Sequence, residues 1–291
     1  MSDETCIDFV HTDGSSGARY IPETVTAGLA TFDYDGDGLI DIYFLNGAPL
    51  RGAESAEQPG NELWRNVGNW QFVNVTRQAG VGHTGFGLGV ATADYDNDGD
   101  ADLYVNNYGP NVLYRNNGDG TFTEVTDVAG VGCGDKVGAG AVFLDANMDG
   151  WLDLYAANYV DFTYENHVTH AQHGYCEYAG PRDYDPVPDV LYQNNGDGTF
   201  TDVSDSSGIR DHAGSGMGMV ATDFDADADT DIFILNDVAG NFLMVNDGKG
   251  HYEEMGLLAG TAYNTYGEAL GSMGVDCADY DNDGRLDFLM T

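Results

Sequence analysis

A nine-residue acidic pattern occurs five times in this chain and restricts its fold more than any other feature. Each copy has oxygen-bearing side chains at positions 1, 3, 5 and 9, and lies between two apolar runs of β-type residues. These residues are Asp33, Asp35, Asp37, Asp41; Asp94, Asp96, Asp98, Asp102; Asp145, Asn147, Asp149, Asp153; Asp223, Asp225, Asp227, Asp231; and Asp279, Asp281, Asp283, Asp287. Hard cations prefer oxygen ligands, and a turn at position 6 lets the carbonyl of position 7 join them. The pattern therefore predicts about five calcium ions.

The loops begin like the calcium loop of an EF-hand, but the residues that follow exclude that structure. An EF-hand needs a bidentate Glu at position 12 and a helix on each side. Position 12 is instead occupied by Phe44, Val105, Ala156, Ile234 and Met290. The residues leaving each loop are strand formers, so we expect each loop to join two strands. Solvated acidic turns are the alternative, and five near-copies argue against it.

The loops belong to a longer repeat, and a period of this length indicates a β-propeller. In the second copy a Gly-rich strand precedes the loop, a second strand follows it, and an Asn-Gly-Asp-Gly turn at 117–120 joins two more. We expect four-stranded antiparallel blades, with small residues where the first strands crowd around an axis. The expected blades cover residues 27–82, 86–132, 138–208, 214–260 and, in part, 271–291.

Residues outside the loops carry a resemblance to a known family. They include Phe9-Val-His11, Tyr20-Ile-Pro22-Glu23-Thr24 and the phrase Leu-Tyr-Arg-Asn-Asn-Gly-Asp-Gly-Thr-Phe, whose repeat ends in Ala-Gly-Val. With these residues the chain resembles FG-GAP/VCBS-repeat β-propellers of the integrin-α type. It more closely resembles the cartilage acidic protein (ASPIC/UnbV) family. The resemblance implies about seven blades and a separate C-terminal domain, more than the sequence contains.

Two arrangements of the whole chain remain open. In the first, residues 25–291 form an incomplete seven-bladed propeller, an open arc with an exposed sheet edge. In the second, the N-terminal segment 1–24 contributes a hairpin over residues 7–21, which pairs with residues 284–291 and closes a five-bladed ring. We favour the incomplete propeller, because nothing after the fifth loop resembles a designed stop.

The net charge of −39 restricts the partners. Such acidity disfavours nucleic acid and anionic membranes, and no apolar run approaches the length of a membrane span. Clustered weak calcium sites need millimolar calcium, which fits a secreted protein in the extracellular space or the periplasm. Residues 1–30 lack a basic start and an apolar core, so no signal peptide is recognised there.

An insert over residues 160–189 separates the second and third strands of the third blade. It contains His167, His170 and His173, followed by Cys176, and this spacing would place the four on one side of a helical turn. Imidazole and thiolate suit zinc or copper, so the histidines form a candidate second metal site. We favour instead a surface loop pinned by a disulfide, since Cys176 cannot be both ligand and disulfide partner.

The four cysteines permit two disulfides without requiring any. Cys133 and Cys176 belong to the same repeat, and a disulfide between them and two free thiols are equal alternatives. Cys277 lies in an expected first strand and is predicted to be a small buried residue. Cys6 has no predicted partner.

Two of the five calcium sites are expected to be weaker than the others. Ala228 stands at position 6, where the other loops have Gly, and a left-handed backbone there costs roughly 1–2 kcal/mol. Asn147 leaves its loop with one carboxylate fewer.

The sequence favours a binding or assembly module over an enzyme. It has no nucleophile elbow, phosphate-binding loop or haem-attachment motif, and most acids are assigned to calcium. We therefore expect an extracellular calcium-binding β-propeller with structural calcium. Its expected partner is a protein or a polysaccharide, within a larger assembly. The alternative is an enzyme that uses the propeller face or a transition metal bound in the insert.

Overall fold

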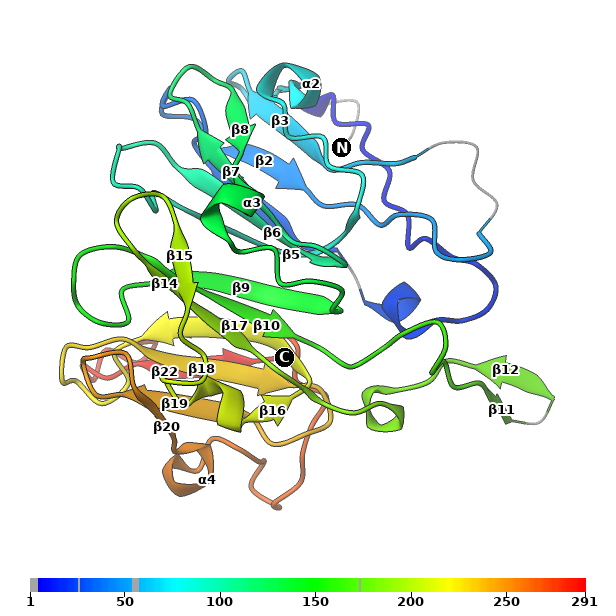
Figure 1. Ribbon diagram of the computed structural model, residues 1–291, viewed down its shortest axis with the longest axis vertical. Helices are drawn as coiled ribbons and strands as arrows, with labels where there is room; N and C mark the ends of the chain where they lie inside the picture. The colour runs from blue at the N-terminus through cyan, green and yellow to red at the C-terminus, as the bar shows by residue number, and fades with distance from the viewer. Residues whose placement is uncertain (1–4, 26, 54–57, 173) are drawn as a thin grey trace.

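The repeats of the sequence form the sheets of the structure, one after another. The structure is a computed structural model that describes residues 5–25, 27–53, 58–172 and 174–291. In the described residues, four antiparallel four-stranded sheets follow in chain order, from the N-terminal sheet at the top of Figure 1 to the fourth sheet at the bottom. A two-stranded sheet comes after them in the chain, and its red strand lies in the lower half of the view. No described helix has the length and apolar character needed to span a membrane.

Each four-stranded sheet is a meander, so neighbouring strands in the sheet are neighbours in the repeat. The first sheet contains β1 (Leu29–Phe32), β2 (Asp41–Phe44), β3 (Glu62–Asn66) and β4 (Phe72–Asn74). The second contains β5 (Phe86–Ala93), β6 (Asp102–Tyr108), β7 (Val112–Asn116) and β8 (Phe122–Glu124). The third contains β9 (Gly138–Leu144), β10 (Asp153–Asn158), β14 (Val190–Asn194) and β15 (Phe200–Asp202). The fourth contains β17 (Gly216–Thr222), β18 (Asp231–Asn236), β19 (Phe242–Asn246) and β20 (Tyr252–Glu254). Strands β21 (Val275–Ala278) and β22 (Asp287–Met290) form the last sheet.

Short elements complete the repeats and the connections. One-turn helices α2 (Thr76–Ala79), α3 (Thr126–Ala129) and α4 (Gly256–Ala259) follow the fourth strands of three sheets. Each ends at a glycine with φ 78°, the left-handed cap that favours glycine. The remaining elements are η1 (Ile21–Thr24), η2 (Pro181–Asp183), η3 (Ile209–Asp211), β11 (His170–Gln172), β12 (Tyr175–Glu177), β13 (Val187–Pro188) and β16 (Ala213–Gly214).

The first strands of successive sheets contact one another: β1 with β5, β5 with β9, β9 with β17 and β17 with β21. Glycines make this approach possible. A Cβ on Gly140 would lie 2.9 Å from the carbonyl oxygen of Met217, and Cβ atoms on Gly89 and Gly218 would collide with the carbonyls of Ala139 and Met273. The prediction that small residues occupy the contact between neighbouring first strands is therefore confirmed.

The core lies between the sheets. The second strand of each four-stranded sheet carries a buried side chain at its centre, including Tyr43, Tyr104 and Tyr155, which are 0% exposed. Two of the hydroxyls donate to backbone carbonyls, Tyr43 to Val81 at 2.7 Å and Tyr104 to Val131 at 3.1 Å. These bonds satisfy the polar ends of rings that otherwise pack as apolar groups.

The expected N-terminal hairpin is not formed. Residues 7–20 contain no strand and run along the first sheet, where Thr12 and Gly14 accept backbone hydrogen bonds from Gly47 and Leu50, each 3.1 Å long. No ladder joins residues 7–21 to residues 284–291. The closed five-bladed ring, which depended on that pairing, was therefore a wrong alternative. Bonds to the first sheet take up backbone groups that a hairpin would have used.

Candidate metal centres

Each acidic loop is shaped by hydrogen bonds between its own carboxylates and backbone. The position 1 carboxylate accepts the N–H groups of positions 5 and 6, at 2.8–3.1 Å across the five loops. The position 5 carboxylate accepts the N–H of position 7, at 2.9–3.1 Å. These turns bend the chain so that the carboxylates face inward, and the loop joins the first and second strands of its sheet as predicted.

The position 9 aspartate begins the second strand, and it is buried in the first four loops and half-buried in the fifth. In the second loop, Asp102 accepts the N–H of Tyr95 at 3.1 Å with one oxygen and that of Asn116 at 2.8 Å with the other. Burial raises the pKa of Asp102 to about 7, and those of Asp41 and Asp153 to about 6, although these hydrogen bonds oppose the rise. The raised pKa values show that no nearby positive charge offsets the burial of these carboxylates.

Three carboxylates converge in four of the five loops. One oxygen of each lies within 4.8 Å of the others in the groups Asp33, Asp35, Asp37; Asp94, Asp96, Asp102; Asp223, Asp225, Asp231; and Asp279, Asp281, Asp287. The predicted ligands outside these groups are Asp41, Asp98, Asp227, Asp283 and the residues of the third loop, Asp145, Asn147, Asp149 and Asp153. The buried Oδ1 atoms of Asp35 and Asp96 have no hydrogen-bond partner among the described residues. Such groups could hold a metal ion.

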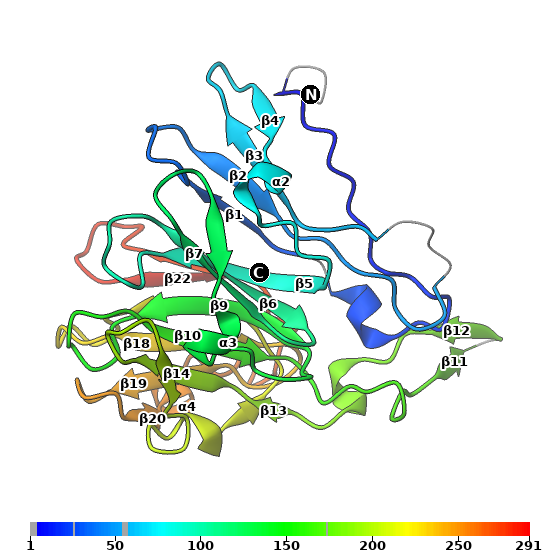
Figure 2. The same ribbon diagram turned by 45° about the horizontal axis from the view of Figure 1, so that its top comes forward.

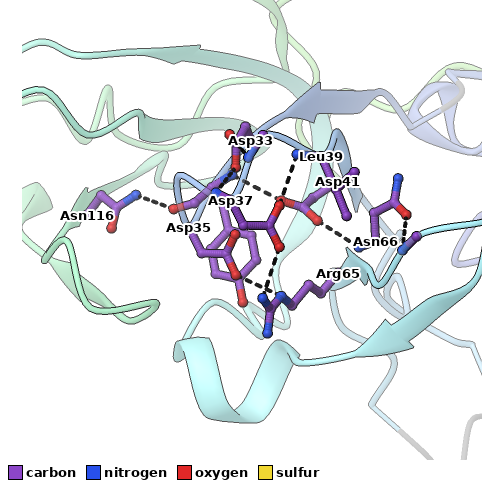
Figure 3. Close-up of polar contacts among 11 residues, drawn as sticks. Asp33, Asp35, Asp37, Leu39, Asp41, Arg65, Asn66 and Asn116 are labelled. Carbon is purple, nitrogen blue, oxygen red and sulfur yellow. Dashed lines mark hydrogen bonds and ion pairs between the residues drawn. The ribbon is translucent and has the colours of Figure 1, made fainter.

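The first loop also contains a built-in cation (Figure 3). The guanidinium of Arg65, on β3, lies 2.7 Å from Asp35 Oδ2 through Nε and 2.9 Å from Asp37 Oδ2 through Nη2. The hydrogen bond from Arg65 is the main cause that lowers the pKa of Asp37. Sequence reasoning missed this residue, because the contact joins a loop to a strand that follows it by more than twenty residues.

The two loops expected to be weaker differ locally from the others. Ala228 has φ 78°, so the predicted left-handed backbone at position 6 is confirmed. Position 4 is left-handed as well, and Ala226 and Met148 occupy it at φ 66° and 58°. The sequence contained a signal for position 4, namely Gly36 in the first loop. In the third loop, the Asn147 amide donates to Asp149 Oδ2 at 2.8 Å, so part of this side chain is turned toward a neighbour.

One asparagine connects each of the first three loops to the sheet that follows it. The side-chain Nδ2 of Asn116, at the end of β7, donates to the carbonyl of Tyr34 in the first loop at 2.9 Å. Asn194 and Asn246 donate in the same way to Tyr95 and Ala146 in the second and third loops, both at 2.8 Å. We call these three contacts the asparagine links. They attach the backbone of a candidate metal loop to the neighbouring sheet.

The histidines of the insert do not form a common site in the described part of the chain. His167 Nε2 lies 3.1 Å from the carbonyl oxygen of Ala18, and His170 Nε2 lies 2.9 Å from Asp183 Oδ2. His173 lies outside the described residues. The prediction of a helical turn that brings these histidines together is wrong. Strands β11 and β12 form a hairpin instead, with Gly174 at φ 84° in its turn. The described residues include no metal-ligand group with His167, His170 or Cys176.

The insert packs instead on the N-terminal segment (Figure 2). Tyr178 donates to Glu23 Oε2 at 3.0 Å, and Arg51 pairs with Glu165 at 2.9 Å. Cys133 and Cys176 are free thiols, as are Cys6 and Cys277, so the disulfide alternative was wrong. Cys277 is half-buried, not buried as predicted, because it belongs to the open last sheet. Contacts between side chains hold the insert without a covalent link.

The chain belongs to the FG-GAP-like repeat family, which matches residues 33–105, 94–156 and 223–290. Among curated proteins it is similar to cartilage acidic protein 1 from Homo sapiens, with 29% identity over 55% of this chain and 25% of that protein. The protein of the same name from Xenopus tropicalis is 28% identical over 45% of this chain and 21% of its own length. The chain thus matches about a quarter of the length of these relatives. The predicted resemblance to the cartilage acidic proteins is confirmed.

Solved structures resemble the chain more distantly. One is a lectin from Agrocybe aegerita, described as recognising non-reducing terminal N-acetylglucosamine, with TM-score 0.48 and 20% identity over 91% of this chain and 61% of that chain. Another is the V. cholerae biofilm matrix protein Bap1, with TM-score 0.41 and 15% identity over 91% of this chain and 35% of that chain.

Proposed function

We propose that this chain is an extracellular calcium-binding β-propeller module that binds a protein or a polysaccharide, with calcium in a structural role. The propeller domain is assigned to residues 25–291, and its five loops take about five calcium ions. The observation that carries the calcium assignment is the convergence of three carboxylates within 4.8 Å in four loops.

The donor set fits a hard divalent cation. All the side chains that converge offer carboxylate oxygens, which calcium prefers over nitrogen or sulfur ligands. Buried oxygens of Asp35 and Asp96 accept no hydrogen bond from the part of the chain that the structure describes, so a cation would give each of them a partner. A divalent ion would also reverse the effect of burial on the position 9 aspartates, since a nearby positive charge lowers a carboxyl pKa.

The placement of the loops supports a structural role for the ion. Each loop joins the first two strands of a sheet, and the asparagine links attach three of the loops to the following sheet. An ion that orders the loop would therefore order both the strand pair and the contact between sheets. Sites of this kind fill at the calcium concentrations of extracellular fluids, which supports a secreted protein.

The calcium proposal is tested by thermal unfolding of the chain with and without calcium. Binding to the native state alone adds stability by mass action, so calcium should raise Tm strongly and a chelator should reverse the rise. Isothermal titration should count about five ions, and magnesium at the same concentration serves as the control. An unchanged Tm after verified removal of the metal would contradict structural calcium.

The binding role is tested separately, with glycan arrays and immobilised extracellular matrix proteins probed in calcium. Saturable binding that a chelator abolishes is the expected result. Metal analysis of the purified chain distinguishes the binding module from the alternative, an enzyme with a transition metal in the insert. Stoichiometric zinc or copper that is lost in a His167→Ala, His170→Ala variant would favour that alternative.

A further inference from the structure

A pocket of about 200 Å³ lies where the insert over residues 160–189 meets the fourth sheet. Strand β13 of the insert pairs there with β16, which leads into the first strand of that sheet. The connection between β18 and β19 forms another wall, so the pocket lies at the end of the sheet away from the acidic loop. The second sheet has only residues 109–111 where the third has the insert. The pocket is therefore not a general feature of the repeat.

The pocket contains a buried carboxylate with one oxygen that lacks a donor. Asp237 is 8% exposed, and its Oδ2 accepts a hydrogen bond from the hydroxyl of Tyr159 at 2.8 Å. Among the described residues none donates to its Oδ1, and the residue lines the pocket. The residues at the equivalent position of the first three sheets are Gly47, Tyr108 and Tyr159. The repeat therefore does not require an acid here, and a hydrogen-bond donor on a ligand would complete the carboxylate.

An arginine in the wall of the pocket has donors to spare. The guanidinium of Arg182, on η2, donates to the carbonyl of Val238 through Nη2 at 3.2 Å and through Nε at 3.4 Å. It forms no ion pair in the part of the chain that the structure describes, although the chain has 49 acidic residues and 10 basic ones. A guanidinium has five N–H donors, and those not used on Val238 remain for a ligand.

These two groups together select a neutral ligand that both donates and accepts hydrogen bonds. A cation would be repelled by Arg182, and an anion would be repelled by Asp237. A hydroxyl group can donate to the carboxylate or accept from the guanidinium, so a ligand with several hydroxyls satisfies both. Val160, Pro181 and Tyr184 contribute apolar surface to the same pocket. Such surface suits the C–H face of a ring.

The size of the pocket limits the ligand to one ring. Its volume of about 200 Å³ is smaller than the roughly 300–1,000 Å³ of pockets for drug-sized ligands. An extended peptide binds by adding a strand to a sheet or by filling a groove, and a pocket of this size offers neither. The net charge of −39 disfavours acidic polysaccharides. An uncharged ring with several hydroxyls meets all of these constraints.

We propose that this pocket binds one neutral pyranose unit of a polysaccharide. One hydroxyl of the sugar donates to Asp237 Oδ1, a second accepts from Arg182, and the C–H face of the ring packs against Tyr184 and Pro181. Tyr159 is a positioning residue, because its hydroxyl holds the other oxygen of Asp237. The inference rests on the proposed binding role, for which it selects a polysaccharide over a protein and supplies the site.

The test is a ligand-observed NMR titration of the 291-residue chain in saturating calcium. The probes are the methyl glycosides of glucose, galactose, mannose and xylose. We expect at least one of them to bind saturably, with a dissociation constant on the order of 1 mM for a ligand of this size. Asp237→Asn keeps the shape of the side chain and removes the charged acceptor, so it should weaken this binding about tenfold.

Asp185→Asn is the matched control for that variant. Asp185 is an exposed acid of the same insert that does not line the pocket, so its loss changes the net charge equally and should leave binding unchanged. Arg182→Gln should also weaken binding several-fold, with Arg210→Gln as its control, because Arg210 pairs with Asp202 outside the pocket. Since Arg182 is exposed, this second arm remains decisive if Asp237→Asn fails to fold.

A loss of binding in either pocket variant that its control does not share supports the proposal. A loss that the control shares, or binding that neither variant weakens, overturns it, because the sugar would then bind elsewhere. Absence of saturable binding by all four glycosides, while calcium still raises Tm, overturns it and leaves the calcium proposal standing. A matrix protein that loses binding in Asp237→Asn, and that no glycoside displaces, would assign the pocket to a protein. That result overturns this inference but not the proposed binding role.

Discussion

At the scale of single residues, the five loops share one backbone and differ in the charges around it. Arg65 contributes a guanidinium to the first loop, whereas the equivalent Arg115 makes no ion pair with the second loop among the described residues. A second departure from the repeat lies outside the loops, just before the third strand of the third sheet. Asp189 is buried there, at the position that Asn61 and Asn111 occupy in the first two sheets. Arg65 and Asp189 each lead to a prediction about charge.

We expect Arg65→Gln to raise the calcium affinity of the first loop. Arg65 occupies oxygens of Asp35 and Asp37 that an ion would otherwise bind. Since the arginine is partly exposed, the gain should be modest, roughly twofold to tenfold. Titration calorimetry of the chain measures it, with Arg115→Gln as the matched control. An equal gain in the control would show that only the net charge matters.

We expect Asp189→Asn to remove a pH-dependent loss of stability. Burial raises the pKa of Asp189 from 3.8 to about 7, with Tyr155 and Asn158 donating to the carboxyl at 2.6 and 2.7 Å. Between about pH 4 and pH 7 the folded state binds the proton and the unfolded state does not. The free energy of unfolding of the parent chain should therefore fall as pH rises through this window.

The measurement is urea unfolding of both chains from pH 4 to pH 8 in saturating calcium. Taking the difference between the chains removes the titration of the other carboxylates. At pH 8 the asparagine variant should be more stable by on the order of 1 kcal/mol or more. A difference that does not change with pH would contradict the prediction.

At the scale of elements, glycines decide how closely the sheets approach. Gly89 on β5 faces the carbonyl of Ala139 on β9, and a Cβ would also lie 3.0 Å from the Cα of Gly140. Both neighbours are backbone atoms, which cannot move aside without shifting a strand. The contact between the first strands therefore depends on the missing side chain.

We expect Gly89→Ala to destabilise the chain by about 1–3 kcal/mol, the usual cost of overpacking. Gly180 is the control, because its φ is −101° and no atom lies within 4 Å of an added Cβ. Gly180→Ala should change the stability by less than about 0.5 kcal/mol. Chemical unfolding measures both. Equal effects would show that the first strands can separate at little cost.

At the scale of the whole molecule, the asparagine links join the sheets into one unit. Asn194 donates to Tyr95 in the second loop and to Leu152 in the loop of its own repeat, whereas the side chain of the adjacent Asn195 bonds to Thr199 and Thr201 of its own hairpin. We expect Asn194→Ala to cost about 1–3 kcal/mol, since buried acceptors lose their donors. The variant should also unfold in more than one step.

Calorimetric unfolding in calcium measures this cooperativity, and Asn195→Ala is the matched control. The control should keep a single transition and lose less than about 1 kcal/mol. If Asn194→Ala also kept a single sharp transition, the links would not couple the sheets. The comparison separates a contact between sheets from one within a hairpin of the same sequence pattern.

Much of the fold could be predicted because its signals are local. Loop positions, hairpin turns and strand alternation recur within about fifty residues in each repeat. The predictions that were wrong each rested on a single local pattern. The Gly-Ser-Ser-Gly stretch at 14–17 resembled a hairpin turn, but the first sheet bonds the segment as an extended chain. The three-residue spacing of His167 and His170 resembled a helix, but Gly174 allows a tight β-turn.

The sequence by itself determined the repeat, the carboxylates of each loop and the strand order, because these depend on neighbours along the chain. Only the tertiary structure decided what lies against each loop. Arg65 reaches the first loop from β3, and Asn116 reaches it from the next sheet, 82 residues beyond Tyr34. Contacts between sheets depend on register and packing, which no short pattern encodes.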